Sequence, residues 1–522
     1  FYAMGYTEEE LKKPLIGICC AANEIIPGHM HLDTIAKAAK YGVLEAGGTP
    51  IEFPAIGICD GIAMGHDGMK YPLASRELVA DSIEAVANGH AFDGLVLIPN
   101  CDKIVPGMLM AAARLNIPTV VVSGGPMLPG RFQGKDISVS TVFEAAGRFE
   151  SGQIDACQLK EIEHCACPGC GSCSGLFTAN TMNCMTEVLG MGLPGNGTIP
   201  AAYNGKRIAL AKYAGMHVMR LVEKNICPRD IMTKAAFENA ITVDMAIGGS
   251  SNTALHLPAI AHEFGIEIDA DTFERIHKSA HYLLDVRPAG RWPSEYVYYA
   301  GGVPAIMEEV RHLLHLDVMT VTGKTLGENL DGLKAGGYYE KCAEYLKKTG
   351  VKKEDIIRPF DAPIGDKGTI AILRGNLAPE GAVVKHSAVP VEMHKALLRA
   401  RPFDCEEDAI AAVIAHDIKP GDAVFIRYEG PKGSGMPEMF YTTEAISSDP
   451  ELGKTIALIT DGRFSGASKG PAIGHVSPEA AEGGPIALVE EGDLIQIDIP
   501  ARVLAIVGSE HAVGPMKGGY MK

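Results

Sequence analysis

Short apolar runs alternate with amphipathic stretches through the first part of this chain, and this alternation restricts the folds that it can adopt. The amphipathic stretch 31–48 has apolar residues at helical spacing, and a second such stretch follows Ser75, which is expected to cap its helix. The predicted strands are PLIGICC (14–20), PIEFPAIG (50–57), DGLVLIP (93–99) and TVVVS (119–123). Strands and helices in this order predict a parallel sheet with covering helices, an α/β/α arrangement over residues 1–350.

The character of the sequence changes beyond about residue 340. A charged segment, YLKKTGVKKEDI (345–356), precedes prolines 359 and 363 and is typical of a linker. Short β-like runs separated by glycine and proline turns follow: TIAILRG (369–375), AVVKHSAV (382–389), AVFIRYEG (423–430), IALITDG (456–462) and DLIQIDIP (493–500). They predict a second, β-rich and barrel-like domain over residues 365–522.

Charge, hydropathy and cysteine content exclude several classes of function. The net charge of −17, without a basic stripe interleaved with aromatic residues, argues against nucleic acid as a partner. No apolar run approaches the roughly 20 residues that span a bilayer, so no membrane role is expected. Thirteen cysteines, an odd number, without a secretory signal, argue against a disulfide framework and indicate the reducing cytoplasm.

A ladder of cysteines is the strongest chemical motif. Cys165, Cys167, Cys170 and Cys173 form CACPGCGSC, directly before the helix-like stretch SGLFTANTMNC. Thiolates at such spacing can hold zinc or an iron–sulfur cluster, and Cys173 is best placed to gain from the start of the helix. A structural zinc knuckle is the alternative, but no second CxxC or HxxxH pair completes it. The pattern therefore favours a partly open, catalytic cluster.

Acidic residues follow several predicted strands, where open α/β sheets bind their ligands. Asp60, Asp102 and the glycine-bounded Glu438 offer the hard oxygen ligands that suit a magnesium-like ion. Cys101 stands beside Asp102, so a cluster held by Cys101 and Cys173 would lie against this cation. Lys103 and Ser465 are less informative. From the residues alone, Lys103 could neutralise Asp102, and Ser465 is typical of a turn.

Eight motifs, in this order, resemble the family of dihydroxy-acid and 6-phosphogluconate dehydratases over essentially the whole chain. They are NEIIPGHMHLD, CDGIAMGHDGMKYPLASRELVADSIE, PNCDKIVPGMLM, CPGCGSCSGLFTANTMNC, AIGGSSNTALHL, GNLAPEGAVVK, RYEGPKGSGMPEM and TDGRFSGASKGPAIGHVSPEA. The PGHMHL segment is similar to the branched-chain amino-acid branch of the family. Phe1 corresponds to a point inside family sequences, so the usual N-terminal stretch is expected to be missing from this sequence.

The resemblance implies a role for each candidate residue. It implies iron–sulfur ligands at Cys101 and Cys173, magnesium ligands at Asp60, Asp102 and Glu438, a carbamylated magnesium ligand at Lys103, and a catalytic base at Ser465. Members with a 2Fe-2S cluster carry a third ligand cysteine where this chain has Gly28, and the PGH pattern is associated with a 4Fe-4S cluster. The cluster type thus stays open, with Cys20, Cys59 or Cys170 as a third thiolate and Cys165 and Cys167 as bystanders.

The reaction that the resemblance implies is the dehydration of 2,3-dihydroxy-3-methyl carboxylates to 2-keto acids in valine, isoleucine and leucine biosynthesis. It also implies a homodimer, with the site between the two domains and a small dihydroxy acid as substrate. A sugar-acid dehydratase of the same family is one alternative. From a different class, an iron–sulfur electron carrier or a zinc structural protein would leave the strand-end acids incidental.

Overall fold

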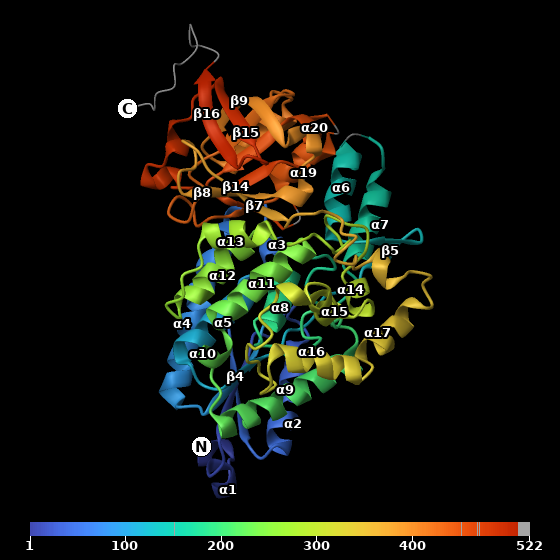
Figure 1. The fold of residues 1–522 in the computed structure, drawn as a ribbon, viewed down its shortest axis with the longest axis vertical. Helices are drawn as coiled ribbons and strands as arrows, with labels where there is room; N and C mark the ends of the chain where they lie inside the picture. Colours follow the sequence, from blue (N-terminus) through green and yellow to red (C-terminus); the bar gives the residue numbers. More distant parts are fainter. Residues whose placement is uncertain (151, 450, 467, 469, 510–522) are drawn as a thin grey trace.

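Four parallel strands form the central sheet of the N-terminal domain in the computed structural model (Figure 1). In spatial order they are β2 (Thr49–Pro54), β1 (Leu15–Cys20), β3 (Gly94–Ile98) and β4 (Thr119–Val121). The structure describes residues 1–509 except 151, 450, 467 and 469. Every residue of β3 is buried, as expected for a strand covered on both faces. The predicted parallel sheet is confirmed.

Two pairs of helices lie against this sheet. Helices α2 (Leu32–Glu45) and α9 (Asn204–Lys224) pack on each other and on the strands, while α4 (Pro72–His90) packs on α5 (Ile104–Leu115). The prediction that Ser75 caps α4 is wrong. The helix begins at Pro72, whose ring fixes the backbone angle that a first helical residue needs, and the Ser75 hydroxyl donates to the Pro72 carbonyl inside the first turn.

The close approach of α2 and α9 depends on a glycine. A Cβ atom on Gly42 would lie 2.0 Å from the Lys212 carbonyl oxygen, and this neighbour is backbone that cannot swing aside. We expect Gly42→Ala to lower the free energy of unfolding by about 1–3 kcal/mol, the usual cost of overpacking. Gly89→Ala in α4 is the control, because a Cβ there meets nothing within 4 Å and should be neutral or stabilising. Equal midpoints of thermal unfolding for the two variants would contradict this account.

A layer of buried helices separates the central sheet from the C-terminal domain (Figure 1). It contains α8 (Thr178–Val188), α11 (Lys234–Ile247), α12 (Thr253–His262) and α13 (Ala270–His277), the last of which packs on the C-terminal strand β7. The remaining longer helices of this domain are α6 (Val139–Glu150), α7 (Ala156–Ala166), α15 (Gly302–Glu309), α16 (Leu326–Ala335) and α17 (Tyr338–Leu346).

The C-terminal domain is built around one mixed sheet of eight strands. In spatial order they are β16 (Val503–Ser509), β15 (Asp493–Asp498), β9 (Lys395–Phe403), β10 (Asp422–Ile426), β12 (Ala457–Thr460), β14 (Ala472–Ser477), β8 (Gly381–Lys385) and β7 (Ile370–Leu373). The two edges approach each other at a bridge between Arg374 and Val503. The sheet therefore curls around its own apolar core, which confirms the barrel-like prediction.

The chain forms helices where it crosses from one parallel strand to the next. Helix α18 (Glu406–Ile414) lies between β9 and β10 in the chain, and α19 (Tyr441–Ser448) lies between β10 and β12. All five predicted β-runs contain strands, whereas β9, β14 and β16 were not predicted. In β9 the sequence KALLRARPF mixes charged and apolar residues because several of its positions face solvent, and Leu397 is exposed.

The segment expected to link the domains is held against the N-terminal domain. Ile356 and Ile357 are fully buried there, and Ile357 forms a β-bridge with Leu284. A second bridge joins Tyr282 to Gly365. Within the described residues no helix combines the length and the apolar character needed to cross a membrane.

Candidate active site

The strand order of the N-terminal sheet determines where side chains gather. The chain runs from β1 outward to β2 and then returns past β1 to β3, so the order reverses between β1 and β3. Such a reversal opens a crevice at the carboxyl ends of the strands. Gly28 follows β1, Asp60 opens the short helix α3 (Asp60–Ala63) after β2, and Cys101 with Asp102 follow β3. Gly28, Asp60, Cys101 and Asp102 line a single cavity at this edge.

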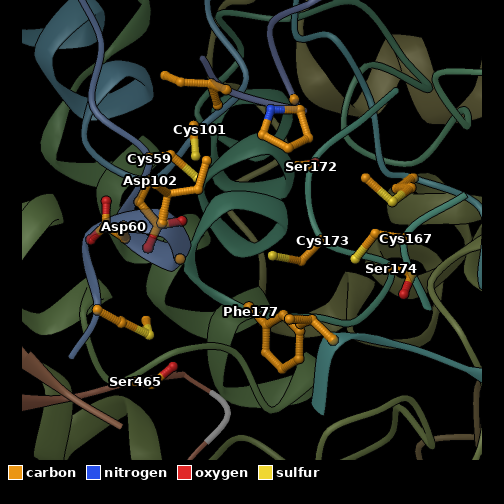
Figure 2. Close-up of a pocket in the computed structure, with 18 of the residues that line it drawn as sticks. Cys59, Asp60, Cys101, Asp102, Cys167, Ser172, Cys173, Ser174, Phe177 and Ser465 are labelled. Atoms are coloured by element: carbon orange, nitrogen blue, oxygen red, sulfur yellow. The ribbon is translucent and has the colours of Figure 1, made fainter. Parts of the chain in front are cut away.

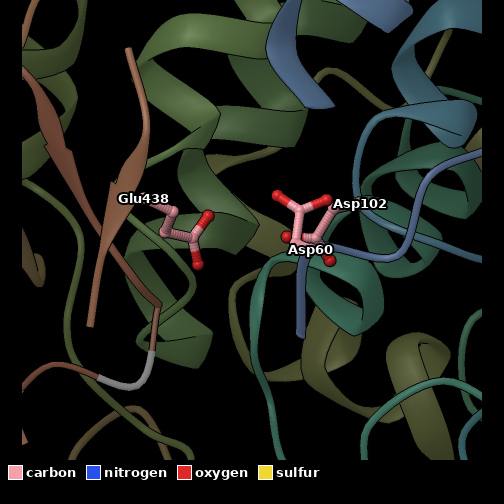
Figure 3. Close-up of side chains that lie close together, drawn as sticks. All are labelled: Asp60, Asp102 and Glu438. Carbon is pink, nitrogen blue, oxygen red and sulfur yellow. The ribbon is translucent and has the colours of Figure 1, made fainter. Parts of the chain in front are cut away.

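A third carboxylate reaches the same place from the C-terminal domain. Glu438 lies in β11 (Glu438–Met439), which pairs in parallel with β13 (Arg463–Phe464) so that Glu438 is opposite Arg463. One oxygen each of Asp60, Asp102 and Glu438 lies within 4.8 Å of the others, and all three side chains are buried (Figure 3). This arrangement joins the acids that the sequence suggested as ligands of one cation.

Two buried cations stand among these carboxylates. Lys103 Nζ lies 2.7 Å from Asp60 Oδ2, 3.4 Å from Asp102 Oδ2 and 3.8 Å from Glu438 Oε2. The Arg463 guanidinium donates to Glu438 and lies 3.5 Å from Asp60 Oδ2. Asp60 Oδ1 is nevertheless buried without a hydrogen-bond partner among the described residues. Three carboxylates against two cations, with an acceptor left over, fit a site for a divalent ion with oxygen ligands.

The three carboxylates and the two cations act on each other's pKa values, because all of them are buried close together. Burial raises the pKa of Asp102 to about 7, although the positive charge of Lys103 opposes the rise. Burial and Arg463 act to lower the pKa of Lys103, but the three carboxylates outweigh them and raise it. A divalent cation would favour the ionised form of Asp102 in the same way that Lys103 does.

Thiols line the cavity beside the acids. Cys59, Cys101, Cys167 and Cys173 all face it (Figure 2). The contact with Cys59, together with burial, holds the pKa of Cys101 well above its usual value, and burial does the same for Cys173. Such thiols release their protons only when a cation binds them, so they suit a metal group.

The arrangement of these sulfurs does not match a zinc knuckle. A tetrahedral zinc site would hold its sulfurs about 4 Å from one another. Among the described residues the acid group is the sole set of three or more ligand atoms within 4.8 Å, so no three thiols meet this requirement. All thirteen cysteines are free, and Cys165 packs in a separate apolar cluster with Phe132. The structure thus disperses the ladder and leaves Cys167 and Cys173 at the cavity.

Ser465 completes the group from the C-terminal side. It follows β13 directly, is 8% exposed, and faces the cavity together with Cys101 and Cys173 (Figure 2). The cavity has a volume of about 260 Å³. Its other walls are largely apolar: Ile26, Ile62, Met64, Met127, Val139, Phe143, Phe177 and Phe440. All seven candidate residues therefore lie in or beside one cavity between the domains, with Lys103 behind the acids.

The structure also assigns places to residues that sequence reasoning passed over or left open. Arg463 was missed, although it stands two residues before Ser465 and is fully buried against Glu438 and Asp60. Asn252 was also missed, and its amide donates to Glu438 at 3.2 Å. Of the three candidates for a third thiolate, Cys59 lines the cavity, whereas Cys20 belongs to the apolar core and Cys170 is not among the lining residues.

The fold and this site agree with the comparisons to known proteins. The dihydroxy-acid/6-phosphogluconate dehydratase family matches the chain over both of its domains, the N-terminal one at residues 13–329 and the C-terminal one at residues 355–514. The chain belongs to this family, and it is a hydro-lyase. It is 58% identical to a dihydroxy-acid dehydratase of Ruminiclostridium cellulolyticum over 96% of this chain and 88% of the relative. A dihydroxy-acid dehydratase of Moorella thermoacetica is 56% identical, over 98% of this chain and 90% of the relative.

Proposed function

We propose that this chain removes water from 2,3-dihydroxy-3-methyl carboxylates, namely 2,3-dihydroxyisovalerate and 2,3-dihydroxy-3-methylvalerate. The products are the 2-keto acids of valine, isoleucine and leucine biosynthesis. One observation carries the proposal: three carboxylates, a set of thiols and Ser465 share one cavity between the domains. The names of the relatives, at 56–58% identity over nearly the whole chain, support it.

The walls of the cavity favour a branched aliphatic substrate over a sugar acid. Methionine, isoleucine, valine and phenylalanine side chains form most of its surface, and these suit the methyl groups of a dihydroxy-methyl acid. A polyol would leave its additional hydroxyls without hydrogen-bond partners against such walls. No lysine or arginine is among the described residues that line the cavity, so a phosphorylated sugar acid would lack a counter-ion.

The acid group would hold magnesium. Asp60, Asp102 and Glu438 provide the oxygen ligands, and the unpartnered Asp60 Oδ1 is the acceptor that a cation would satisfy. Lys103, buried between them, would be carbamylated in the loaded enzyme. A carbamate adds another negative oxygen ligand to the site, which is favourable only beside a divalent cation.

The thiols would hold an iron–sulfur cluster, with Cys101 and Cys173 as ligands and Cys59 or Cys167, which line the same cavity, as a third. Gly28 lies on the cavity wall and cannot contribute a thiolate. When bound, the two groups supply Lewis acidity, the cation at the substrate carboxylate and 2-hydroxyl and the cluster at the departing 3-hydroxyl.

Ser465 would act as the base. Its alkoxide accepts the proton from C2 while the C3–oxygen bond breaks, and Ser465 then passes this proton to the departing hydroxide, which leaves as water and restores the alkoxide. The resulting enol tautomerises to the 2-keto acid, so no oxidant or reductant is consumed. An unperturbed serine is too weak a base for this step, so the bound cation and cluster would have to stabilise its alkoxide. The apolar walls exclude water and strengthen these interactions.

We further propose that the chain acts as a homodimer in the cytoplasm. The homodimer is the state expected for this family, and thirteen free cysteines suit a reducing compartment.

The test of the proposed function is a substrate panel with protein purified without oxygen. We expect 2-keto acid formation from 2,3-dihydroxyisovalerate with kcat/KM at least about 100-fold above that for gluconate, the size of discrimination that unpaired polar groups bring about. Iron, sulfide and magnesium should be present in the same samples. A preference for gluconate would favour the sugar-acid dehydratase, and inactive protein containing zinc alone would refute the proposal.

A further inference from the structure

Both backbone polar groups of Cys101 are held by hydrogen bonds. Its carbonyl oxygen accepts from the N–H groups of Ile104 and Val105 in the first turn of α5, each at 3.2 Å. Its own N–H donates to Nε2 of His29 at 3.1 Å, from a residue 72 positions further along the chain. Because hydrogen bonds are directional, contacts on both sides of the Cα atom set the direction in which the Cys101 thiol leaves the backbone.

The tautomer of His29 follows from its two partners. Nδ1 lies 2.7 Å from the carbonyl oxygen of Ala21, which can only accept, so Nδ1 carries the hydrogen. Nε2 faces the N–H of Cys101 and therefore has the lone pair that accepts it. The His29 side chain is 0% exposed, so bulk water reaches neither nitrogen. His29 is thus a neutral imidazole that joins the end of β1 to Cys101.

His29 is itself fixed in place by the fold. Its carbonyl oxygen accepts a hydrogen bond at 3.1 Å from Leu32, the first residue of α2. The preceding residue, Gly28, accepts at 2.9 Å from the side chain of Asn100, the neighbour of Cys101. The turn after β1 and the loop after β3 are therefore held together by two adjacent contacts that need no metal group.

The other proposed cluster ligand has a separate support. The amide of Asn180, in α8, donates to the Cys173 carbonyl and, at 2.7 Å, to the Gly175 carbonyl. These contacts do not involve His29. A change at His29 should therefore act on the Cys101 side of the site and leave the Asn180 contacts in place.

We propose that His29 is a positioning residue for the iron–sulfur cluster, and that it aims the Cys101 thiolate at the cavity by accepting the Cys101 N–H. The inference rests on the proposed function, because it takes Cys101 as a cluster ligand. His29 does not itself line the cavity, so it acts through Cys101. Removing a group that orients a metal ligand typically costs 10- to 100-fold in metal affinity.

The Cys101 N–H also connects His29 to the electronic properties of the cluster. Without the Nε2 acceptor this buried N–H stays unpaired or turns towards sulfur. Hydrogen bonds to the sulfurs are among the factors that set the reduction potential of a cluster. A loss of the acceptor should therefore change the spectrum of the cluster as well as its retention.

The test compares three substitutions of His29 in protein purified without oxygen. Glutamine can place an acceptor where Nε2 lies, asparagine can place a donor where Nδ1 lies, and leucine offers neither. We expect His29→Gln to keep the iron content, the rate of iron release to a chelator and the electron paramagnetic resonance spectrum of the reduced wild type. His29→Asn and His29→Leu should release iron at least about tenfold faster and show altered spectra.

His281→Leu is the matched control. The Nδ1 atom of His281 pairs with the Phe360 carbonyl at 3.0 Å, and this histidine does not line the cavity. Its iron release and spectrum should equal those of the wild type.

The comparison of glutamine with asparagine decides the proposal, including the case in which His29→Leu does not fold. Equal iron release by His29→Gln and His29→Asn would overturn it, because the bond to Cys101 would then have no effect of its own. If wild-type protein holds a cluster and all three variants match it, only this inference fails. If the wild type holds no iron–sulfur cluster, the proposed function fails and this inference fails with it.

Discussion

Replacing Ser465 by alanine is expected to lower kcat by about 10²- to 10⁴-fold, the contribution usual for a positioned acid or base. Ser465 is buried at the cavity wall, and the substitution removes one oxygen atom without adding bulk. The acids and thiols are left in place, so iron, sulfide and magnesium contents should match those of the wild type. The measurement is 2-keto acid formation under saturating substrate, together with elemental analysis of the same preparation.

Ser279→Ala serves as the control for this substitution. Ser279 donates its hydroxyl to the Ile276 carbonyl at the end of α13, and it does not line the cavity. Its kcat should remain within about twofold of the wild type, since substitutions away from such sites have small effects. Near-normal turnover by Ser465→Ala with full metal content would remove Ser465 as the base while leaving the metal assignments intact.

Replacing Cys173 by serine should have the second large effect. A hydroxyl is a poor ligand for iron, and Cys173 lines the cavity. It lies in the loop before α8 and not at the helix start that the sequence predicted, because α8 begins only at Thr178. We expect most of the iron and sulfide to be lost. Turnover should fall by more than about 100-fold, because even loss of a residue that merely orients a metal ligand costs 10- to 100-fold. Visible absorption and iron content measure the cluster directly.

The matched control is Cys170→Ser, three residues earlier in the same ladder. Cys170 is not among the residues that line the cavity, so this variant should keep its iron, sulfide and activity. If both variants lose the cluster to the same extent, the ladder as a whole binds it and the assignment from cavity geometry is wrong. If Cys173→Ser keeps a full cluster, the ligand must be sought among Cys59, Cys101 and Cys167.

The local parts of the fold could be predicted from the sequence. The buried runs at β1 and β3 and the helical spacing of α2 are properties of neighbouring residues, and each element was found near its predicted position. The start of α4 was misplaced because Pro72 at a first helical turn competes with Ser75 as a signal. Strand β9 was missed because its exposed positions break the apolar pattern.

The candidate site was predictable in kind but not in arrangement. Placement after the strands suggested Asp60 and Asp102 as ligands, because the carboxyl ends of parallel strands meet at one edge. Nothing local joined Glu438 to them, and Arg463 gave no signal of its own. Ser465 was typical of a turn until the family resemblance was considered, since a serine after a strand is common.

The sequence by itself determined the elements, the ligand types and the family resemblance, because these depend on residues close together in the chain. Only the tertiary structure decided which ligands meet. The pairing of β11 with β13 sets Glu438 beside Arg463, and the docking of the two domains brings both to Asp60. Packing within the N-terminal domain places Cys165, near the end of α7, in a separate apolar cluster, while Cys167 and Cys173 line the cavity. Contacts between such distant residues arise from strand register and domain packing, which local periodicity does not encode.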